Sequence, residues 1–250
     1  MKTLVFTNQK GGVGKTVTAF NVAYDLATLH GQRVLLIDTD PQGNLSYLSG
    51  AQQDRGRELY TALQNKTLAN IPRHVYSNLD MITADARLSL LQAGDTGALR
   101  DILKPLKEKY DLCVIDTPPM LTPITIMDYM AADLIYIVTT AEYFSILGVG
   151  QMVNTLDGVK NRNRGVKLGG IILTALEQRA TVDKKLKEMI MALAKQLNTA
   201  ALEPPISKAA VVKTSIIFQQ PLEMAAANSK PAQDYRALSK NILRNIKGDK

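Results

Sequence analysis

Short apolar runs alternate with longer amphipathic stretches along most of the chain. An uninterrupted apolar run is typical of a parallel strand that is buried on both faces, whereas apolar positions three and four residues apart predict a helix. These two patterns predict strands at 3–7, 34–38, 112–116, 134–138 and 170–173, and helices at 16–29, 90–108, 147–160 and 182–197.

Strands that alternate with helices require crossover connections, which are right-handed in nearly all proteins. The pattern therefore predicts the α/β class: a doubly wound, mostly parallel sheet with helices on both faces. We expect residues 1–250 to form a single domain, because no linker, repeat or low-complexity segment interrupts the chain. Such sheets bind ligands at the carboxyl ends of their strands.

The charge is distributed unevenly along the chain, whose formal net charge is +7. Residues 1–125 hold 13 Lys and Arg against 12 Asp and Glu, whereas residues 126–250 hold 17 against 11. A basic half favours a polyanionic partner such as nucleic acid or an anionic membrane surface. An ordinary basic surface without a partner would give the same count.

Cysteine and hydropathy patterns limit the location and chemistry of the protein. The single cysteine, Cys113, excludes an internal disulfide and a multi-cysteine metal site within one chain. The sequence predicts neither a membrane span nor a signal peptide, so we expect a cytoplasmic protein. His30 and His74 lie in surface-like contexts, and no serine or cysteine triad accompanies them.

A glycine-rich loop from Lys10 to Thr16 joins the first expected strand to the first expected helix. Consecutive backbone N–H groups at such a turn bind phosphate at the positive end of the helix. Glycine lets this backbone approach the phosphates closely. In this setting Lys15 is placed to reach the β and γ phosphates, and the Thr16 hydroxyl to bind Mg²⁺.

The loop departs from the usual phosphate-loop pattern, because Gln9 stands where that pattern has glycine. The segment Lys-Gly-Gly-Val-Gly-Lys-Thr instead resembles the deviant Walker A box of the ParA/MinD ATPases, which have the P-loop NTPase fold. The resemblance covers nearly the whole chain and is nearest to the ParA/Soj partition proteins. It implies an ATPase that uses Mg²⁺ and forms a homodimer with ATP, in which Lys10 contacts the partner's phosphates. Val17 is a departure, because these ATPases commonly have a second threonine there.

Two aspartates that close apolar strands resemble the family's remaining nucleotide-site segments. The stretch 38–44 resembles switch I, in which Asp40 would orient the attacking water and Asp38 would hold the metal's water shell. The stretch 110–119 resembles Walker B and switch II, in which Asp116 would bind Mg²⁺ through water. Either aspartate could otherwise be a helix N-cap. The resemblance thus implies catalytic roles for Lys10, Lys15 and Asp40, metal binding by Thr16, Asp38 and Asp116, and ATP binding by Lys10, Gly11, Gly12, Val13, Gly14, Lys15, Thr16, Val17, Pro205 and Ile206.

The partner of the ATPase is inferred from basic residues that follow the strand at 170–173. Arg179 matches the arginine with which ParA-type proteins contact nonspecific DNA, and Lys184, Lys185 and Lys187 follow it. Contacts of this kind need only positive charge near phosphates. The alternative is that these lysines form the solvated face of a helix whose core side holds Leu186, Met189, Ile190 and Leu193.

The resemblance implies a partition protein that binds double-stranded DNA, associates with the nucleoid and is stimulated by a ParB-type partner. It would segregate or position a plasmid, mobile element or chromosome. The main alternative is a MinD-like ATPase at the membrane, because 235–247 has an apolar face flanked by basic residues. We expect that segment to be an ordinary packed helix. A scaffold with negligible turnover is a third possibility, which Lys10 and Asp40 argue against.

Overall fold

The computed structural model describes residues 1–51, 56–92, 94–177 and 181–248, apart from the side chains of 144–147 and 151. The described strands form one eight-stranded sheet in the order β3-β4-β2-β5-β1-β6-β7-β8. β3 pairs antiparallel with β4, and every other described pair is parallel. The strands are β1 (Lys2–Thr7), β2 (Val34–Asp38), β3 (Arg73–Tyr76), β4 (Leu79–Ile82), β5 (Leu112–Asp116), β6 (Leu134–Thr140), β7 (Lys167–Thr174) and β8 (Ala201–Leu202).

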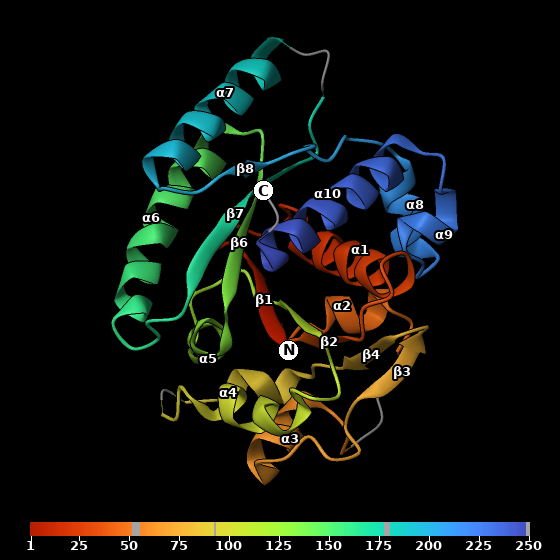
Figure 1. Cartoon of the computed structure of the whole chain (residues 1–250), viewed down its shortest axis with the longest axis vertical. Coiled ribbons are helices and arrows are strands. Elements are labelled where there is room, and N and C mark those ends of the chain that lie inside the picture. The colour runs from red at the N-terminus through yellow and green to blue at the C-terminus, as the bar shows by residue number, and fades with distance from the viewer. Residues whose placement is uncertain (52–55, 93, 178–180, 249–250) are drawn as a thin grey trace.

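Helices cover both faces of the sheet, as the sequence predicts (Figure 1). One face is covered by α1 (Lys15–Thr28), α2 (Asn44–Leu48), α8 (Val211–Ile217), α9 (Leu222–Ala226) and α10 (Lys230–Lys247). The other is covered by α3 (Leu59–Asn65), α4 (Ala98–Leu103), α5 (Pro123–Ala131), α6 (Tyr143–Lys160) and α7 (Thr181–Gln196), with short 3₁₀ turns at η1 (Ala86–Leu90) and η2 (Lys104–Leu106). The predicted α/β doubly wound class is confirmed.

The helix predicted at 90–108 is wrong in its first half. Helical structure begins only at Ala98, after a non-helical stretch that contains Gly94 and Gly97. Glycine lowers helix stability by about 1 kcal/mol relative to alanine, so two glycines outweigh the apolar periodicity here. The preceding residues 86–90 form a separate 3₁₀ turn that Asp85 caps through the Arg87 N–H.

The C-terminal segment is a packed helix. Ser229 accepts a hydrogen bond from the Ala232 N–H at the start of α10, and Gly248 ends the helix with a φ of 75°. Its apolar side chains Tyr235, Leu238 and Ile242 are buried in the core cluster that includes α1. Among the described residues, no helix is both long enough and apolar enough to cross a membrane.

The sheet topology brings the predicted site residues together at one edge. β1 lies between β5 and β6, and the connection through α1 passes over β5 to reach β2. The register places Asp38 beside Asp116 and Phe6 beside Asp116. The loop after β1 and the two strand-closing aspartates therefore meet at the carboxyl ends of three adjacent strands.

Candidate functional site

The phosphate-binding loop connects β1 to α1 and leaves the first turn of the helix open. Gly12 and Gly14 have φ angles of 75° and 88°, a region that favours glycine. No side chain of the described residues caps the N-terminus of α1, and its first turn holds no acidic residue. The helix therefore presents unpaired N–H groups and a positive dipole end to an anion.

Three side-chain hydrogen bonds hold this loop in place. The Asn8 side-chain amide donates to the Val138 carbonyl at 2.6 Å and accepts from the Lys10 N–H at 2.9 Å. The Thr174 hydroxyl donates to the Val13 carbonyl at 2.7 Å. Because β6 and β7 thus anchor both ends of the loop, its backbone donors are oriented before any ligand arrives.

Lys15 is buried at the bottom of the loop, with 6% of its surface exposed. Its ammonium donates to the Lys10 carbonyl at 3.3 Å. Burial lowers the pKa of Lys15, and the nearby Asp116 and Asp40 carboxylates oppose that effect. A buried cation aimed along the loop suits a ligand that carries several negative charges.

Asp116 is the most unusual group of the site. It is fully buried, and neither of its carboxylate oxygens has a hydrogen-bond partner of normal geometry among the described residues. Burial and the neighbouring Asp38 raise the pKa of Asp116 well above its usual value, and the Thr16 hydroxyl and Lys15 offset this only in part. Two unpartnered oxygens beside a threonine hydroxyl form the kind of oxygen site that a hard divalent cation requires.

Asp38 differs from its neighbour because the chain itself satisfies it. Its carboxylate accepts hydrogen bonds from the Ser46 N–H and hydroxyl, both at 2.8 Å, and from the Asp40 N–H at 3.1 Å. Burial still raises the pKa of Asp38 to about 7. Asp38 therefore fixes the start of α2, and its predicted contact with a metal's water shell stays a prediction.

Asp40 and Lys10 lie at the rim of the site. Asp40 lines the cavity in front of the loop and accepts the Gln42 N–H at 3.0 Å. Lys10 is exposed, and its ammonium is paired with the carboxylate of Glu142. Asp40 thus lines the same cavity as the phosphate-binding loop, and Lys10 lies at the outer surface.

Two adjoining cavities meet at Gly12, Gly14 and Val17. The first, about 430 Å³, is lined by the loop, Asp40 and Pro119. The second, about 310 Å³, is mostly apolar and is lined by Val13, Ile206, Val212 and Tyr235 among others. Pro205 is buried but is not among the lining residues. A charged compartment next to an apolar one fits a nucleotide, with its phosphates on the loop and its base beside Ile206.

A larger cavity of about 740 Å³ lies elsewhere, between the loop that precedes β3 and the segment that contains Leu106 and Lys109. Its two basic residues already have partners: Arg57 donates to the carbonyls of Asn70 and Pro72, and Lys109 pairs with Asp80. It contains none of the predicted site residues.

The predicted DNA contacts lie on a different part of the surface. Arg179 lies outside the described residues. Lys184 and Lys185 are exposed on α7, whereas Lys187 is half-buried and pairs with Glu203 at 2.8 Å. On the core side of α7, Leu186 and Leu193 pack as expected and Ile190 is buried, but Met189 is 38% exposed, so its core placement was wrong.

Sequence reasoning missed several polar residues that shape the site. Asn8 and Thr174 anchor the loop, Ser46 binds Asp38, and Asp128 binds Thr39. Ser46 lies eight positions from Asp38, whereas the partners of Asn8, Thr174 and Asp128 are distant in the chain. Sequence motifs, which depend on the spacing of nearby residues, do not reveal such contacts.

Comparison with known proteins gives two family matches. A family described as "AAA domain" matches residues 1–168, and one described as "4Fe-4S iron sulfur cluster binding proteins, NifH/frxC family" matches residues 123–249. The second stretch contains no cysteine, so the residues there offer no thiolate to an iron–sulfur cluster.

Two partition proteins match nearly the whole chain. The chromosome partitioning protein ParA of Myxococcus xanthus is 32% identical over 96% of this chain and 87% of its own length. The chromosome-partitioning ATPase Soj of Thermus thermophilus is 31% identical over 98% of this chain and 97% of its own.

Solved structures share the fold. Apo McdA from Cyanothece superposes with a TM-score of 0.85 at 25% identity, over 97% of this chain and 99% of that one. Cobyrinic acid a,c-diamide synthase from Mycobacterium smegmatis, with bound ADP and magnesium, superposes with a TM-score of 0.83 at 28% identity, over 100% of this chain and 97% of that one. Because these neighbours carry different names, the fold alone does not decide the role.

Proposed function

Because this chain belongs to the family of ParA/Soj partition ATPases, we propose that it uses ATP to form a dimer that binds DNA without sequence preference and so partitions a DNA molecule. The family membership makes the protein an ATPase that uses ATP and Mg²⁺. The observation that supports this chemistry best is the buried, unpartnered Asp116 carboxylate beside Thr16 and Lys15 at the start of α1.

The residues of the site divide the work of phosphoryl transfer. Thr16 and Asp116 would hold the Mg²⁺ ion, with Asp38 acting on its water shell, and the ion would neutralise charge on the β and γ phosphates. Lys15 and the N–H groups of Gly11 to Thr16 would bind the same phosphates. Asp40 would orient the attacking water. Asp116 would hold the cation in its charged form, which a nearby divalent charge strongly favours.

The dimer is proposed from the position of Lys10. Lys10 directly precedes Gly11, which lines the nucleotide cavity, and its exposed side chain is held by Glu142 in the single chain. From there it would reach the phosphates of a facing subunit. Both partners of this pair are substantially exposed, with 42% and 61% of their side-chain surfaces accessible. An exposed ion pair contributes at most about 1 kcal/mol, so a partner's triphosphate can displace Glu142 easily.

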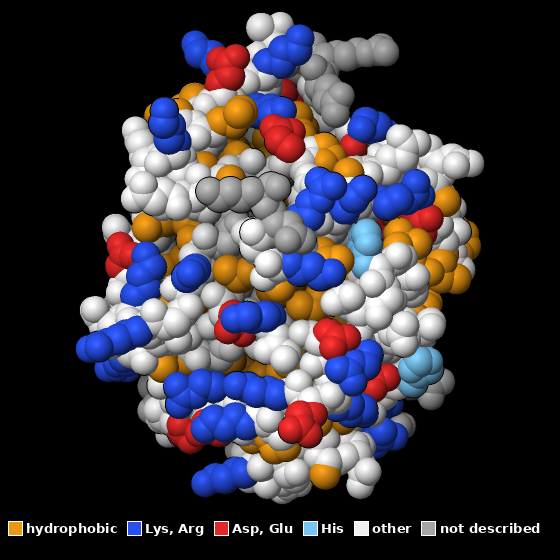
Figure 2. Space-filling view, in the orientation of Figure 1, with side chains coloured by type: hydrophobic (Ala, Val, Ile, Leu, Met, Phe, Trp, Pro, Cys, Tyr) orange, Lys and Arg blue, Asp and Glu red, His pale blue; other side chains and the backbone are white. Residues whose placement is uncertain are grey.

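The DNA surface is proposed from charge. Lys184 and Lys185 are exposed and form no ion pair with any described residue, and Arg179 precedes them in the chain. Lys187 is a weaker candidate because Glu203 already neutralises it. Figure 2 shows Lys and Arg side chains over much of the viewed face, with acidic groups between them. Such a surface suits weak, salt-sensitive contact with phosphates, which two copies in a dimer would strengthen. A ParB-type partner would stimulate hydrolysis and release the protein from the nucleoid.

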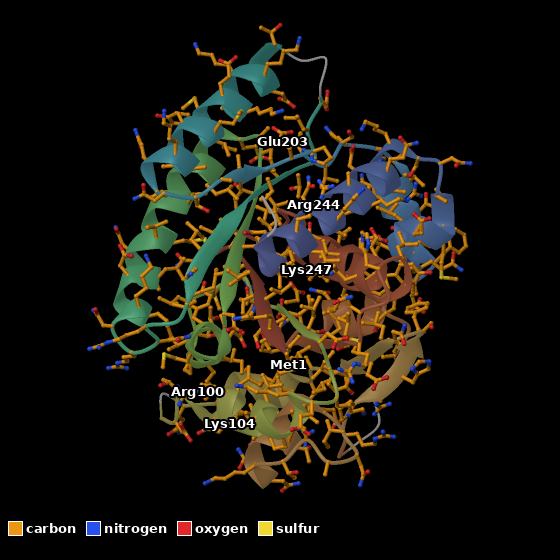
Figure 3. All side chains as sticks on the ribbon, viewed as in Figure 1. Met1, Arg100, Lys104, Glu203, Arg244 and Lys247 are labelled. Carbon is orange, nitrogen blue, oxygen red and sulfur yellow. The ribbon has the colours of Figure 1, made fainter. Side chains whose placement is uncertain are left out.

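The membrane alternative would require α10 to change its packing. Its apolar residues Tyr235, Leu238 and Ile242 are at most 3% exposed. Its exposed side carries Lys240, Arg244 and Lys247, the last two labelled in Figure 3. With the apolar face occupied, only the electrostatic part of membrane binding remains available.

Binding to random-sequence duplex DNA, measured by fluorescence anisotropy with ATP, ADP or no nucleotide, tests the proposal. We expect binding only with ATP, weakening steeply with salt, and falling at least about 10-fold in a K184A/K185A variant. The matched control is K104A/K107A, which removes the same number of positive charges at η2. Lys104 lies at the opposite end of the view from α7 (Figures 1 and 3).

Anionic liposomes form the second arm of the same experiment. DNA binding that ignores nucleotide, or that both variants weaken equally, contradicts the proposed surface. ATP-dependent liposome binding without DNA binding contradicts the partition role itself and favours membrane positioning.

A further inference from the structure

A second buried carboxyl group, Asp128, lies behind the nucleotide site on helix α5. It is fully buried, and its Oδ2 atom is 2.8 Å from the Thr39 hydroxyl oxygen. The same hydroxyl oxygen is 2.8 Å from the backbone carbonyl oxygen of Asp116, to which the Thr39 N–H also donates at 3.1 Å. Thr39 therefore joins three segments: the switch I stretch 38–44, the end of β5, and α5.

The single hydroxyl proton of Thr39 limits which of these hydrogen bonds Thr39 can donate. A threonine hydroxyl has one proton, so it cannot donate fully to both the Asp116 carbonyl and Asp128. Both short contacts are satisfied if Thr39 donates to the carbonyl and a neutral Asp128 donates to the Thr39 oxygen. Burial raises the pKa of Asp128 well above its usual value, and Asp116 and Asp38 add to that effect while the Thr39 bond opposes it.

An ordinary structural role does not account for Asp128. It does not cap its helix, because α5 begins with a Thr122 capping box six positions earlier. It forms no ion pair with any described residue, and its Oδ1 atom has no hydrogen-bond partner there. Burying a carboxyl group when one of its two oxygens makes no hydrogen bond costs stability. Thr39, its hydrogen-bond partner, lies between the two predicted site aspartates Asp38 and Asp40.

The next residue of α5 makes a parallel contact. The Tyr129 hydroxyl lies 2.8 Å from the Thr7 hydroxyl, and Thr7 accepts a hydrogen bond from Thr117 at 3.0 Å. Thr117 directly follows Asp116. Consecutive side chains of α5 thus contact the segments on either side of the metal-binding aspartate.

We propose that Asp128 is a positioning residue for ATP hydrolysis: through Thr39 it fixes the Asp38–Asp40 segment against the end of β5, so that the water-orienting and metal-binding aspartates keep one relative position. Asp128 touches neither nucleotide nor metal in this scheme. A small displacement of Asp40 lowers the rate because the attacking water must be aligned with the γ phosphate. The inference rests on the ATPase activity and not on the DNA proposal.

Single-turnover ATP hydrolysis without DNA tests this role. D128A should lower the rate constant about 10- to 100-fold and change the affinity for ATP less than about threefold, because ground-state binding does not use the pair. D128N should keep the rate within about threefold of wild type, since its amide N–H can donate the same bond to Thr39.

Thr39 supplies a second pair of variants in case D128A does not fold, as thermal unfolding would reveal. T39V preserves the shape and removes the hydroxyl, so it should reproduce the loss, whereas T39S keeps the hydroxyl and should retain the rate. The D128A/T39V double variant should be no slower than the slower single variant. A wild-type rate in D128A or T39V, or an equal loss in D128N and D128A, overturns the proposal.

Discussion

At the interface of α1 and α10, two buried carboxyl groups bind groups of the chain itself, and Asp116 at the end of β5 differs from them. Asp234 accepts the Ser207 N–H at 3.0 Å and pairs with Lys230, and Asp25 accepts the Ser239 hydroxyl at 3.3 Å. Asp116 is equally buried, but neither of its oxygens has a hydrogen-bond partner of normal geometry among the described residues.

The two regions have similar burial and similar chemistry, so burial cannot be what distinguishes them. A buried carboxyl that has protein partners stabilises a particular packing, here the attachment of α10 and of the 205–208 segment. A buried carboxyl without partners lowers stability in the absence of ligand and requires a compensating group. Such a group at a phosphate-binding loop marks the place where a ligand completes the structure.

The largest effect should follow from removing the unpartnered carboxylate. D116N should reduce Mg²⁺-dependent ATP hydrolysis by at least about 1,000-fold, equal to about 4 kcal/mol of transition-state stabilisation, because the metal site loses its carboxylate charge. The same substitution should leave the ligand-free protein at least as stable as wild type, as measured by urea unfolding. A destabilised D116N would show that Asp116 is satisfied by the chain, like Asp234.

The next effect concerns Asp25, whose pKa burial and the neighbouring Glu223 raise to about 7. Because the folded pKa exceeds the usual value of 3.8, the folded state binds the extra proton, and this contribution to stability is lost as the pH rises through about 7. D25N does not titrate. Its stability relative to wild type should therefore increase by about 2 to 4 kcal/mol between pH 4 and pH 8.

Urea unfolding of wild type and D25N across that range measures the difference. Other buried acids, such as Asp38, titrate in both proteins and cancel. A difference that stays constant with pH would mean that Asp25 is charged in the folded protein.

A smaller effect is expected from the satisfied carboxyl Asp234. D234A should lower the free energy of unfolding by about 1 to 3 kcal/mol, because the buried Ser207 N–H loses its acceptor. It should weaken ATP binding only indirectly, through the segment beside Ile206. D234N, which keeps an acceptor for Ser207, is the matched control. Equal stability of D234A and wild type would remove the distinction between the two regions.

The smallest effect should come from the exposed Lys10–Glu142 pair. E142Q removes the charge of this partner of Lys10, so ATP-dependent dimerisation should tighten by up to about fivefold, consistent with the small energy of exposed pairs. Sedimentation with a non-hydrolysable ATP analogue measures this change. D157N, which breaks the exposed Asp157–Lys160 pair on α6, should have no effect. Weaker dimerisation of E142Q would place Glu142 among the residues that hold the dimer together.

The sequence predicted most accurately those parts whose information is local. The buried strands 34–38 and 112–116 match the structure residue for residue, because continuous apolar runs bounded by charged or glycine-containing segments admit few alternatives. The phosphate-binding loop was recognisable because its glycines, Lys15 and Thr16 are contiguous. These residues do gather at the strand ends, although their individual roles stay predictions.

What the sequence did not predict depends on contacts between distant residues. The sequence did not predict β3 or β4. β3 is short, lies at the edge of the sheet and is largely half-exposed, so it has no apolar run. β4 has only four residues, and Asp80 interrupts its apolar positions. Asp128 lies in an apolar helix, and its partner Thr39 is 89 positions away. Likewise, the sequence could place Lys187 beside Lys184 and Lys185, but not show that Glu203 neutralises it.

Calorimetric titration of a non-hydrolysable ATP analogue into wild type and D116N, with Mg²⁺ and with EDTA, tests most directly whether the unpartnered carboxylate marks a metal–nucleotide site. We predict that Mg²⁺ strengthens binding at least about 10-fold in wild type, and that D116N binds with the same affinity in both conditions. Equal strengthening by Mg²⁺ in both proteins would show that the metal binds elsewhere, and would contradict the assignment.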